Sequence, residues 1–129
     1  EGSLWRSAGS SGACFVFHGR HRRSTSAISP PFHGSSQTGT GGSQLPDLPA
    51  EFNSLPHVRG AVAAARSEKE DSANSQFYIV FQPRFALDKK YTVFGRVIDG
   101  MQYVDAIERG EPPTNPSRIL HAYVAADNP

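Results

Sequence analysis

The sequence predicts one mostly β, antiparallel domain, a barrel or a sandwich, with one short helix near its C-terminal end. Residues 76–81 and 91–98 are rich in aromatic and β-branched side chains, which is the pattern of strands. The small residues at 60–65 are also taken as a strand, although alanine by itself favours helix, and residues 118–125 are taken as a last strand. Several strands with a single late helix favour an antiparallel fold.

The one expected helix follows the strand at 91–98. Asp99 can cap its N-terminus, because a carboxylate accepts hydrogen bonds from the free N–H groups of a first turn. Gly110, with the prolines at 112–113, is expected to stop it. A turn is expected at residues 88–90. The apolar residues that share one face of this helix are Met101, Val104 and Ile107.

The first part of the chain differs in composition from the rest. Only three residues of the Val, Ile and Leu type occur among the first forty of the 129 residues. Such a segment buries little area against the entropy of ordering it. We therefore expect residues 1–36 to be a divergent segment that can remain disordered, and residues 37–129 to hold the folded domain. The triplet at 15–17, Phe-Val-Phe, is a short strand pattern within the first segment.

The single cysteine and the single methionine limit the disulfides, the metal sites and the cellular compartment that we expect for the chain. Cys14 is the only cysteine, so a disulfide within the chain and a cysteine-based metal site are excluded. No apolar run is long enough for a membrane span or a signal-peptide core. A lone thiol suits a reducing compartment, and we expect the cytoplasm. Since the only methionine is Met101, we expect a chain that is truncated or processed in front, and a lost leader would make the periplasm the alternative.

Several motifs, in a fixed order, resemble the cyclophilins. The central one is residues 72–79, Ser-Ala-Asn-Ser-Gln-Phe-Tyr-Ile, and it is followed by residues 91–101, Tyr-Thr-Val-Phe-Gly-Arg-Val-Ile-Asp-Gly-Met. Gly-Thr-Gly-Gly at 39–42 and His-Val-Arg-Gly at 57–60 precede them. The sequence is similar to the compact bacterial type of this family over about two-thirds of the chain. Further matches are Leu87-Asp88 and Val104-Asp105.

The resemblance implies a cyclophilin-like antiparallel β-barrel closed by a helix at each end. This chain would hold the later strands and the second helix of that barrel. The opening strands and the first helix of the family are not recognisable here, so the barrel is expected to be incomplete on its N-terminal side. An incomplete barrel leaves unpaired strand edges and an open core.

The resemblance also implies a peptidyl-prolyl cis-trans isomerase that assists protein folding. Rotation about an X-Pro amide meets a barrier of about 18–20 kcal/mol and breaks no bond. It needs no nucleophile and no cofactor, only a site that binds the twisted amide more tightly than the planar forms. The implied partners are proline-containing peptides, unfolded proteins and cyclosporin-type ligands. We expect the protein to be a monomer and not to bind membranes.

The family's site residues fall on one stretch of the predicted β domain. Gln76 and Tyr78 are two residues apart and therefore lie on one face of a strand. The family usually has phenylalanine in place of Tyr78, so a hydroxyl is added to the pocket and weakens proline binding unless it finds a partner or points outward. Packing in the core is the alternative role for each residue. The other residues that the resemblance places at the substrate are Ala65, Arg66, Asn74, Phe85, Leu87 and Tyr91.

The family's catalytic arginine is the part that matches least. Counting back from Gly39 places it at Arg22 or Arg23, where a fixed cation would stabilise the lone pair of the twisted prolyl nitrogen. The strand expected around that arginine is absent from the pattern, and two prolines at 30–31 would interrupt a central strand. A disturbed reading frame in the coding sequence is one explanation, and true divergence is the other.

Two other functions remain open at the level of sequence. The first is a catalytically impaired cyclophilin-like remnant that binds proline peptides without turnover. The second is a β module whose basic arm binds nucleic acid, since the front of the chain carries more arginine than acid. The arginine cluster at 20–23 lacks the interleaved aromatic residues of nucleic-acid sites, which disfavours the second.

Overall fold

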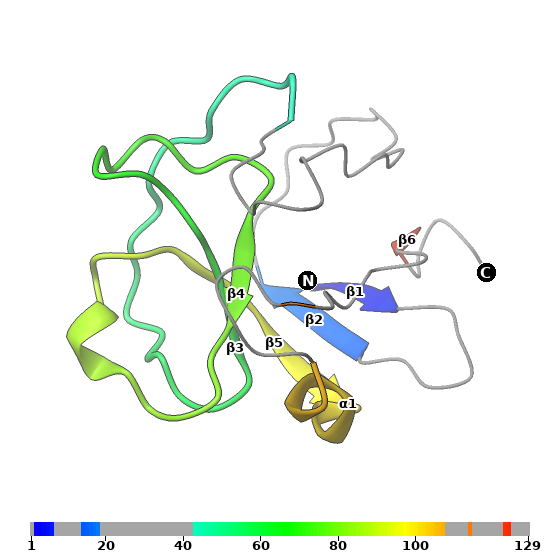
Figure 1. The fold of residues 1–129 in the computed structure, drawn as a ribbon. Helices are drawn as coiled ribbons and strands as arrows, with labels where there is room; N and C mark the ends of the chain where they lie inside the picture. The colour runs from blue at the N-terminus through cyan, green and yellow to red at the C-terminus, as the bar shows by residue number, and fades with distance from the viewer. Residues whose placement is uncertain (1, 7–13, 19–42, 108–113, 115–122, 125–129) are drawn as a thin grey trace.

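A computed structural model describes residues 2–6, 14–18, 43–107, 114 and 123–124. These residues form six strands, one turn of 3-10 helix and one α-helix (Figure 1). The order along the sheet is β4-β3-β5-β2-β1-β6, and every neighbouring pair is antiparallel. The elements are β1 Gly2–Arg6, β2 Cys14–His18, β3 Ala61–Ala64, β4 Phe77–Ile79, the 3-10 turn η1 Phe85–Leu87, β5 Val93–Asp99, α1 Met101–Asp105 and β6 Tyr123–Val124.

Strand β3 lies between β4 and β5 and is buried on both faces. Val62 pairs with Ile79 of β4 on one edge and with Gly95 of β5 on the other. Successive side chains of a strand point to opposite faces, and two small cores form accordingly. One core gathers Ala61, Ala63, Val80 and Val93 with Tyr78 against it, and the other gathers Val62, Val97 and Val104 with Ile79, Phe81, Phe94 and Met101.

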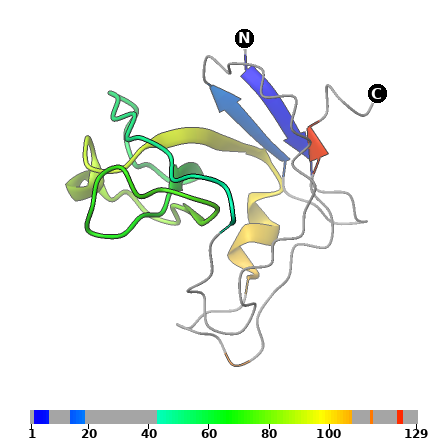
Figure 2. The same ribbon diagram turned by 90° about the horizontal axis from the view of Figure 1, so that it is seen from above.

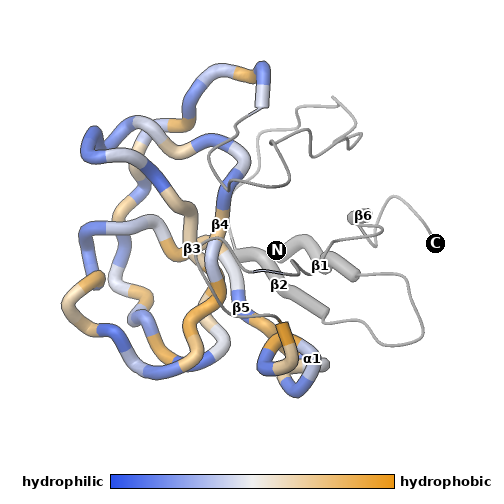
Figure 3. Tube along the Cα trace, in the orientation of Figure 1, coloured by the Kyte–Doolittle hydropathy of each residue, from blue (hydrophilic) through white to orange (hydrophobic). Residues whose placement is uncertain are grey.

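Strand β5 joins the two halves of the sheet. It pairs with β3 along one edge and with β2 along the other, with an irregularity in each ladder. Figure 2 shows it running from the loops around β3 and β4 to the pair formed by β1 and β2, with α1 following directly. The outer loops are mainly hydrophilic, whereas hydrophobic residues concentrate where β5 leads into α1 (Figure 3).

The predicted fold class is confirmed. The strands expected at 60–65, 76–81 and 91–98 are β3, β4 and β5. Strand β4 is shorter than expected at both ends, because it begins at Phe77 and ends at Ile79. The turn at 88–90 is present, with Lys89 in the left-handed region at a φ of 60°. Strand β6 falls within the predicted range 118–125, of which the other residues lie outside the described part of the chain.

The predicted helix is present, but its boundaries differ. Gly100, at a φ of 79°, is the N-cap, so the prediction of an Asp99 cap is wrong. The Asp99 carboxylate instead accepts a hydrogen bond from the Gly100 N–H at 2.8 Å. The helix ends at Asp105, so Ile107 lies beyond it and is 43% exposed. The stop signals expected at 110 and 112–113 lie outside the described residues.

Two strands of the described structure come from the first segment. The triplet at 15–17 lies within β2, as its pattern indicates. Strand β1 is not predicted by any local pattern, and it pairs with β2 on one side and with β6 on the other. The boundary near residue 36 between a divergent segment and a folded domain stays a prediction.

Gly60 is the position where the backbone conformation is most restrictive. Its φ is 86°, and its N–H and C=O bond to Val80 and Val97, each at 2.8 Å. A Cβ there would meet only Val97, at 3.9 Å, so space is not the constraint. The left-handed region is disfavoured for any residue with a Cβ.

Gly60→Ala is expected to lower the free energy of unfolding by about 1–2 kcal/mol, because alanine must adopt the left-handed conformation. Urea unfolding followed by circular dichroism measures the change. Gly60→Asn is the matched control, since asparagine tolerates this region better. Equal losses for the two variants would show that the backbone conformation is not the cause.

Candidate functional site

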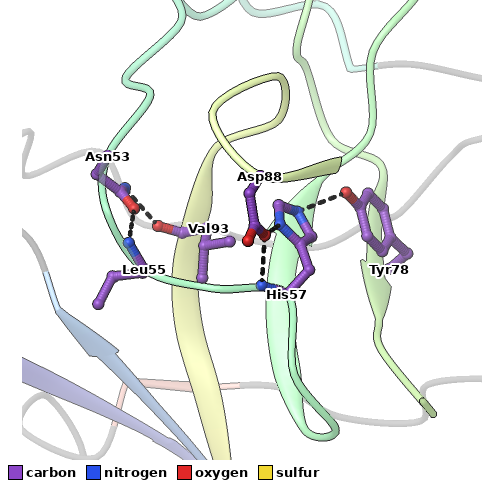
Figure 4. Close-up of polar contacts among 6 residues, drawn as sticks. All are labelled: Asn53, Leu55, His57, Tyr78, Asp88 and Val93. Atoms are coloured by element: carbon purple, nitrogen blue, oxygen red, sulfur yellow. Dashed lines mark hydrogen bonds and ion pairs between the residues drawn. The ribbon is translucent and has the colours of Figure 1, made fainter. Parts of the chain in front are cut away.

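His57 is the most buried polar side chain of the described structure, with 0% of its surface exposed. Its ring Nδ1 lies 2.8 Å from Asp88 Oδ1, and its Nε2 lies 3.1 Å from the hydroxyl of Tyr78 (Figure 4). Its backbone N–H donates to the same Asp88 oxygen at 2.8 Å, and its carbonyl accepts from Arg84 N–H at 2.8 Å. His57 therefore joins the segment before β3 to β4 and to the turn around η1.

The protons of this network follow from the groups that meet. A carboxylate only accepts hydrogen bonds, so Nδ1 of a neutral His57 carries the ring proton and Nε2 is left to accept from the hydroxyl of Tyr78. Burial, with Tyr91 nearby, raises the pKa of Tyr78 to about 12, against an opposing effect of Arg66. The hydroxyl therefore stays protonated and remains a donor near neutral pH. The two bonds from His57, the backbone one first, lower the pKa of Asp88.

Tyr78 stands at the centre of a row of rings. The rings of His57 and Tyr78 are stacked at 18° with centroids 6.1 Å apart. Tyr91 meets Tyr78 edge-on, at 81° and 5.9 Å. The guanidinium carbon of Arg66 lies 4.5 Å from the centroid of the Tyr91 ring, which is a cation–π distance. The hydroxyl of Tyr78 that the sequence adds to the pocket thus has a partner inside the protein.

The Arg66 side chain is committed to the chain's own backbone. Its Nε and Nη2 donate to the carbonyl of Lys90 at 3.2 and 2.7 Å, and its Nη1 donates to the carbonyls of Ser67 and Glu68 at 2.9 and 3.3 Å. These bonds close the loop between β3 and β4 onto the turn before β5. Arg66 therefore shapes the surface beside Tyr91, and little of its donor capacity is left for a ligand.

Asn74 has a similar internal role. Its Oδ1 accepts from the N–H and the hydroxyl of Ser43 at 2.7 and 2.6 Å. Its Nδ2 donates to the carbonyl of Leu45 at 3.1 Å and to Asp47 Oδ1 at 2.9 Å. The Asn74 amide thereby holds residues 43–47 against the loop between β3 and β4. Its predicted contact with a substrate stays a prediction, and the described bonds already use both ends of the amide.

Gln76 lies just before β4 and is exposed. Its carbonyl accepts from the Ala65 N–H at 3.0 Å, which places Ala65 beside it across the ladder between β3 and β4. A buried polar side chain beside an aromatic strand would be costly without a function, but Gln76 is exposed and that argument does not apply to it. Its position two residues before Tyr78 remains the reason to assign it to the site.

Tyr78 and Leu87 share a cavity of about 530 Å³. Phe85 is 62% exposed on the outer side of η1 and is not among the described residues that line this cavity. Arg59 lines it too, but its guanidinium is paired with Asp105 through bonds of 2.9 and 2.6 Å. The described lining is Arg59, Tyr78, Ile79, Val80, Phe81, Gln82, Arg84, Leu87 and Asp105.

Arg22 and Arg23, the predicted catalytic arginines, lie outside the described residues. Among the described arginines, Arg84 lines the cavity, and no described residue bonds to its side chain. His57 was not assigned a role from sequence, although it lies in the His-Val-Arg-Gly motif at 57–60. The sequence signal for His57 is Asp88, which lies in the matching Leu-Asp pair at 87–88. A buried histidine needs a hydrogen-bond partner for each ring nitrogen, and an aspartate can be one of them.

Residues 13–124 match the family described as "Cyclophilin type peptidyl-prolyl cis-trans isomerase/CLD". The chain belongs to the cyclophilin family. A curated relative from Brucella abortus (strain 2308), named "Probable peptidyl-prolyl cis-trans isomerase", is 47% identical over 98 residues, which are 72% of this chain and 50% of the relative. The chain spans about half the length of the curated relatives it matches.

Solved cyclophilin structures share the fold. The cyclophilin AquaCyp293 from Hirschia baltica superposes with a TM-score of 0.64 at 17% identity, over 98% of this chain and 60% of that one. A cyclophilin-type isomerase from Cryptosporidium parvum, crystallised in the presence of the dipeptide Ala-Pro, gives 0.61 at 18% identity, over 96% and 75%. At these identities the likeness supports the cyclophilin architecture alone.

The described residues contain neither a cluster of metal ligands nor a membrane-spanning helix. No group of three or more histidine, cysteine, aspartate or glutamate side chains is gathered there in a way that could hold a metal ion. No helix in that part of the chain has the length and apolar character needed to cross a membrane.

The His57–Asp88 contact predicts a pH dependence of stability. Because the folded-state pKa of Asp88 is lowered, its contribution is present above its unfolded pKa of about 4 and is lost as the pH falls through the folded value. Urea unfolding should therefore show a smaller loss of stability from about pH 5 to about pH 2.5 in Asp88→Asn than in the unsubstituted chain. Glu70→Gln, a substitution of an exposed carboxylate elsewhere on the surface, is the control. An unchanged pH profile in Asp88→Asn would contradict the contact.

Proposed function

We propose that this chain is a peptidyl-prolyl cis-trans isomerase that assists protein folding by stabilising the twisted X-Pro amide. The observation that carries the proposal is the shared cavity of Tyr78 and Leu87, the two residues that match the family's proline pocket. An aromatic ring and a leucine offer the apolar wall that a pyrrolidine ring requires. Tyr91 adds a second ring edge-on to the first.

The chemistry that such a site supplies is differential binding. The planar amide is stabilised by resonance, and the twisted amide leaves a lone pair on the prolyl nitrogen. A wall that holds the ring positions the peptide, and a donor aimed at the nitrogen lowers the barrier. We propose Gln76 for gripping the peptide beside the proline, and Arg22 or Arg23 for the cation.

Binding without turnover is the second candidate. It is favoured by one observation, namely that the sequence around Arg22 and Arg23 does not match the family's pattern at the catalytic arginine. A chain that keeps the proline wall and lacks a placed cation would bind proline peptides and leave their isomerisation rate unchanged. The dipeptide Ala-Pro, used with the Cryptosporidium parvum protein, is a suitable probe of such binding here, and cyclosporin-type ligands are proposed as competitors.

A protease-coupled assay on a proline tetrapeptide separates the two candidates. Cooperative thermal melting is measured first, so that a folded sample is assured. A rate above that of buffer, proportional to protein concentration, supports the isomerase. A rate equal to buffer from a folded chain that still binds Ala-Pro supports the binding module instead.

Gln76→Ala is expected to lose most of the catalysed rate, by about tenfold or more, because the side chain would grip the peptide beside the twisted amide. Its exposure means that the substitution should leave the melting temperature nearly unchanged. Gln102→Ala, an exposed glutamine on α1, is the matched control and should retain the full rate. Full activity in Gln76→Ala would remove it from the site.

Single substitutions of the arginines locate the cation. Arg22→Ala, Arg23→Ala and Arg84→Ala are compared, and the one that supplies the cation should lower kcat by about 100-fold, the usual worth of one electrostatic donor in a transition state. Arg84 is included because it lines the cavity and no described residue bonds its side chain. If Arg22→Ala and Arg23→Ala both keep full activity, their assignment is wrong.

A further inference from the structure

We infer that His57 is a positioning residue for the proline-binding wall: held by Asp88, its buried imidazole fixes the ring of Tyr78 through the tyrosine hydroxyl. The inference rests on the proposed function in one respect, since that function places Tyr78 at the proline. The network itself is a matter of geometry and can be tested separately.

The imidazole is held firmly enough to act as a support. It is completely buried, and Asp88 Oδ1 accepts from both its ring and its own backbone N–H, each at 2.8 Å. Two bonds to one oxygen fix the rotation of the ring about its χ angles. The Nε2 lone pair is therefore directed at one place, the hydroxyl of Tyr78 at 3.1 Å.

The support determines how Tyr78 presents its ring. The hydroxyl is tied inward to His57, while Tyr91 meets the ring edge-on at 81°. Both degrees of freedom of the tyrosine side chain are thereby restrained before a ligand arrives, which reduces the entropy lost on binding. The polar atom is satisfied inside the protein, so the ring meets the cavity as an apolar surface.

The pairing also explains why tyrosine suits this position. A phenylalanine would fill the same space but leave the buried Nε2 of His57 without a donor, and an unsatisfied buried acceptor is costly. Conversely, a tyrosine without His57 would leave its own hydroxyl to compete with the proline ring for the pocket. Each residue supplies the hydrogen-bond partner that the other would otherwise lack, so the contributions of His57 and Tyr78 to binding should be coupled.

A double-mutant cycle measures that coupling. The four chains are the unsubstituted one, His57→Asn, Tyr78→Phe and the double variant. Asparagine keeps an N–H near the place of Nδ1 for Asp88 and removes Nε2. The readouts are KM and kcat for a proline tetrapeptide, the dissociation constant of Ala-Pro, and the ¹⁵N NMR shift of His57 Nε2. Tyr103→Phe, which removes an exposed tyrosine hydroxyl on α1, is the control.

The expected loss lies in binding. His57→Asn should raise KM and the Ala-Pro dissociation constant about fivefold, the worth of one hydrogen bond, with kcat unchanged. In the Tyr78→Phe background the same substitution should cost less than about twofold, because its route of action is already gone. Tyr78→Phe should shift the Nε2 resonance, and Tyr103→Phe should not.

Other results would overturn the inference. Equal losses of His57→Asn in both backgrounds, or a fall in kcat at constant KM, would indicate a general structural role. An Nε2 shift that ignores Tyr78→Phe would remove the contact itself, and this readout decides even if His57→Asn fails to fold. Failure of the proposed function is recognised separately, because a folded chain without turnover contradicts catalysis alone. The double-mutant cycle on Ala-Pro binding then still tests His57. Equal binding in all four chains, or no binding in any of them, contradicts the positioning function of His57.

Discussion

The small side chains of β3 are the constraint on which the rest of the described structure depends. Ala61, Val62 and Ala63 are between 0% and 4% exposed, with a pairing partner on each edge of the strand. Because the two alanines add only a methyl group each, Tyr78 and Val93 can pack directly over them. Larger residues here would overpack the interior and displace the neighbouring strands. The position of Tyr78, and with it the site, follows from this close approach.

His57 shows how a polar group can enter such an interior. Among the described residues, no buried side-chain nitrogen or oxygen lacks a hydrogen-bond partner, and His57 meets this requirement with both ring nitrogens. Leaving either unsatisfied would cost about 1–3 kcal/mol. The imidazole is therefore acceptable only as part of a set with Asp88 and Tyr78. A single network thus stabilises the packing and orients the aromatic wall.

Local patterns were sufficient where local forces dominate. The strands β4 and β5 follow from aromatic and β-branched residues, and the turn at 88–90 from its composition. The prediction of β3 rests partly on the family resemblance, because alanine favours helix. Strand β1 could not be predicted in this way, because its residues carry no strand pattern of their own and its ladder depends on β2 and on β6, which lies at the other end of the sequence. The prediction that Asp99 caps the helix was wrong for a related reason. Gly100 is the N-cap and has a left-handed backbone conformation, which follows from the path of the chain between β5 and α1 and not from the residue types nearby.

The candidate site was predictable to a similar extent. Residue types and motif order identified Tyr78, Leu87 and Tyr91, and the structure brings Tyr78 into contact with Tyr91 and into one cavity with Leu87. The bonds of Arg66 to the Lys90 carbonyl and of Asn74 to Ser43 could not be foreseen, because these partners lie 24 and 31 positions away in the sequence. The exposure of Gln76 likewise depends on β4 being the last strand in the described sheet order.

The arrangement separates two properties that an isomerase usually combines. In the proposed function, Tyr78 and Leu87, with Tyr91 beside them, would contact the proline ring, and that ring changes little between the cis, trans and twisted forms of the amide. Such contacts bind ground state and transition state alike, so they lower KM without raising kcat. Acceleration must come from a group that senses the nitrogen lone pair, and that group is the part of the family pattern that this chain matches least. Affinity for proline peptides and catalysis of their isomerisation are therefore independent properties here, and the wall built on β3 and His57 accounts only for the first.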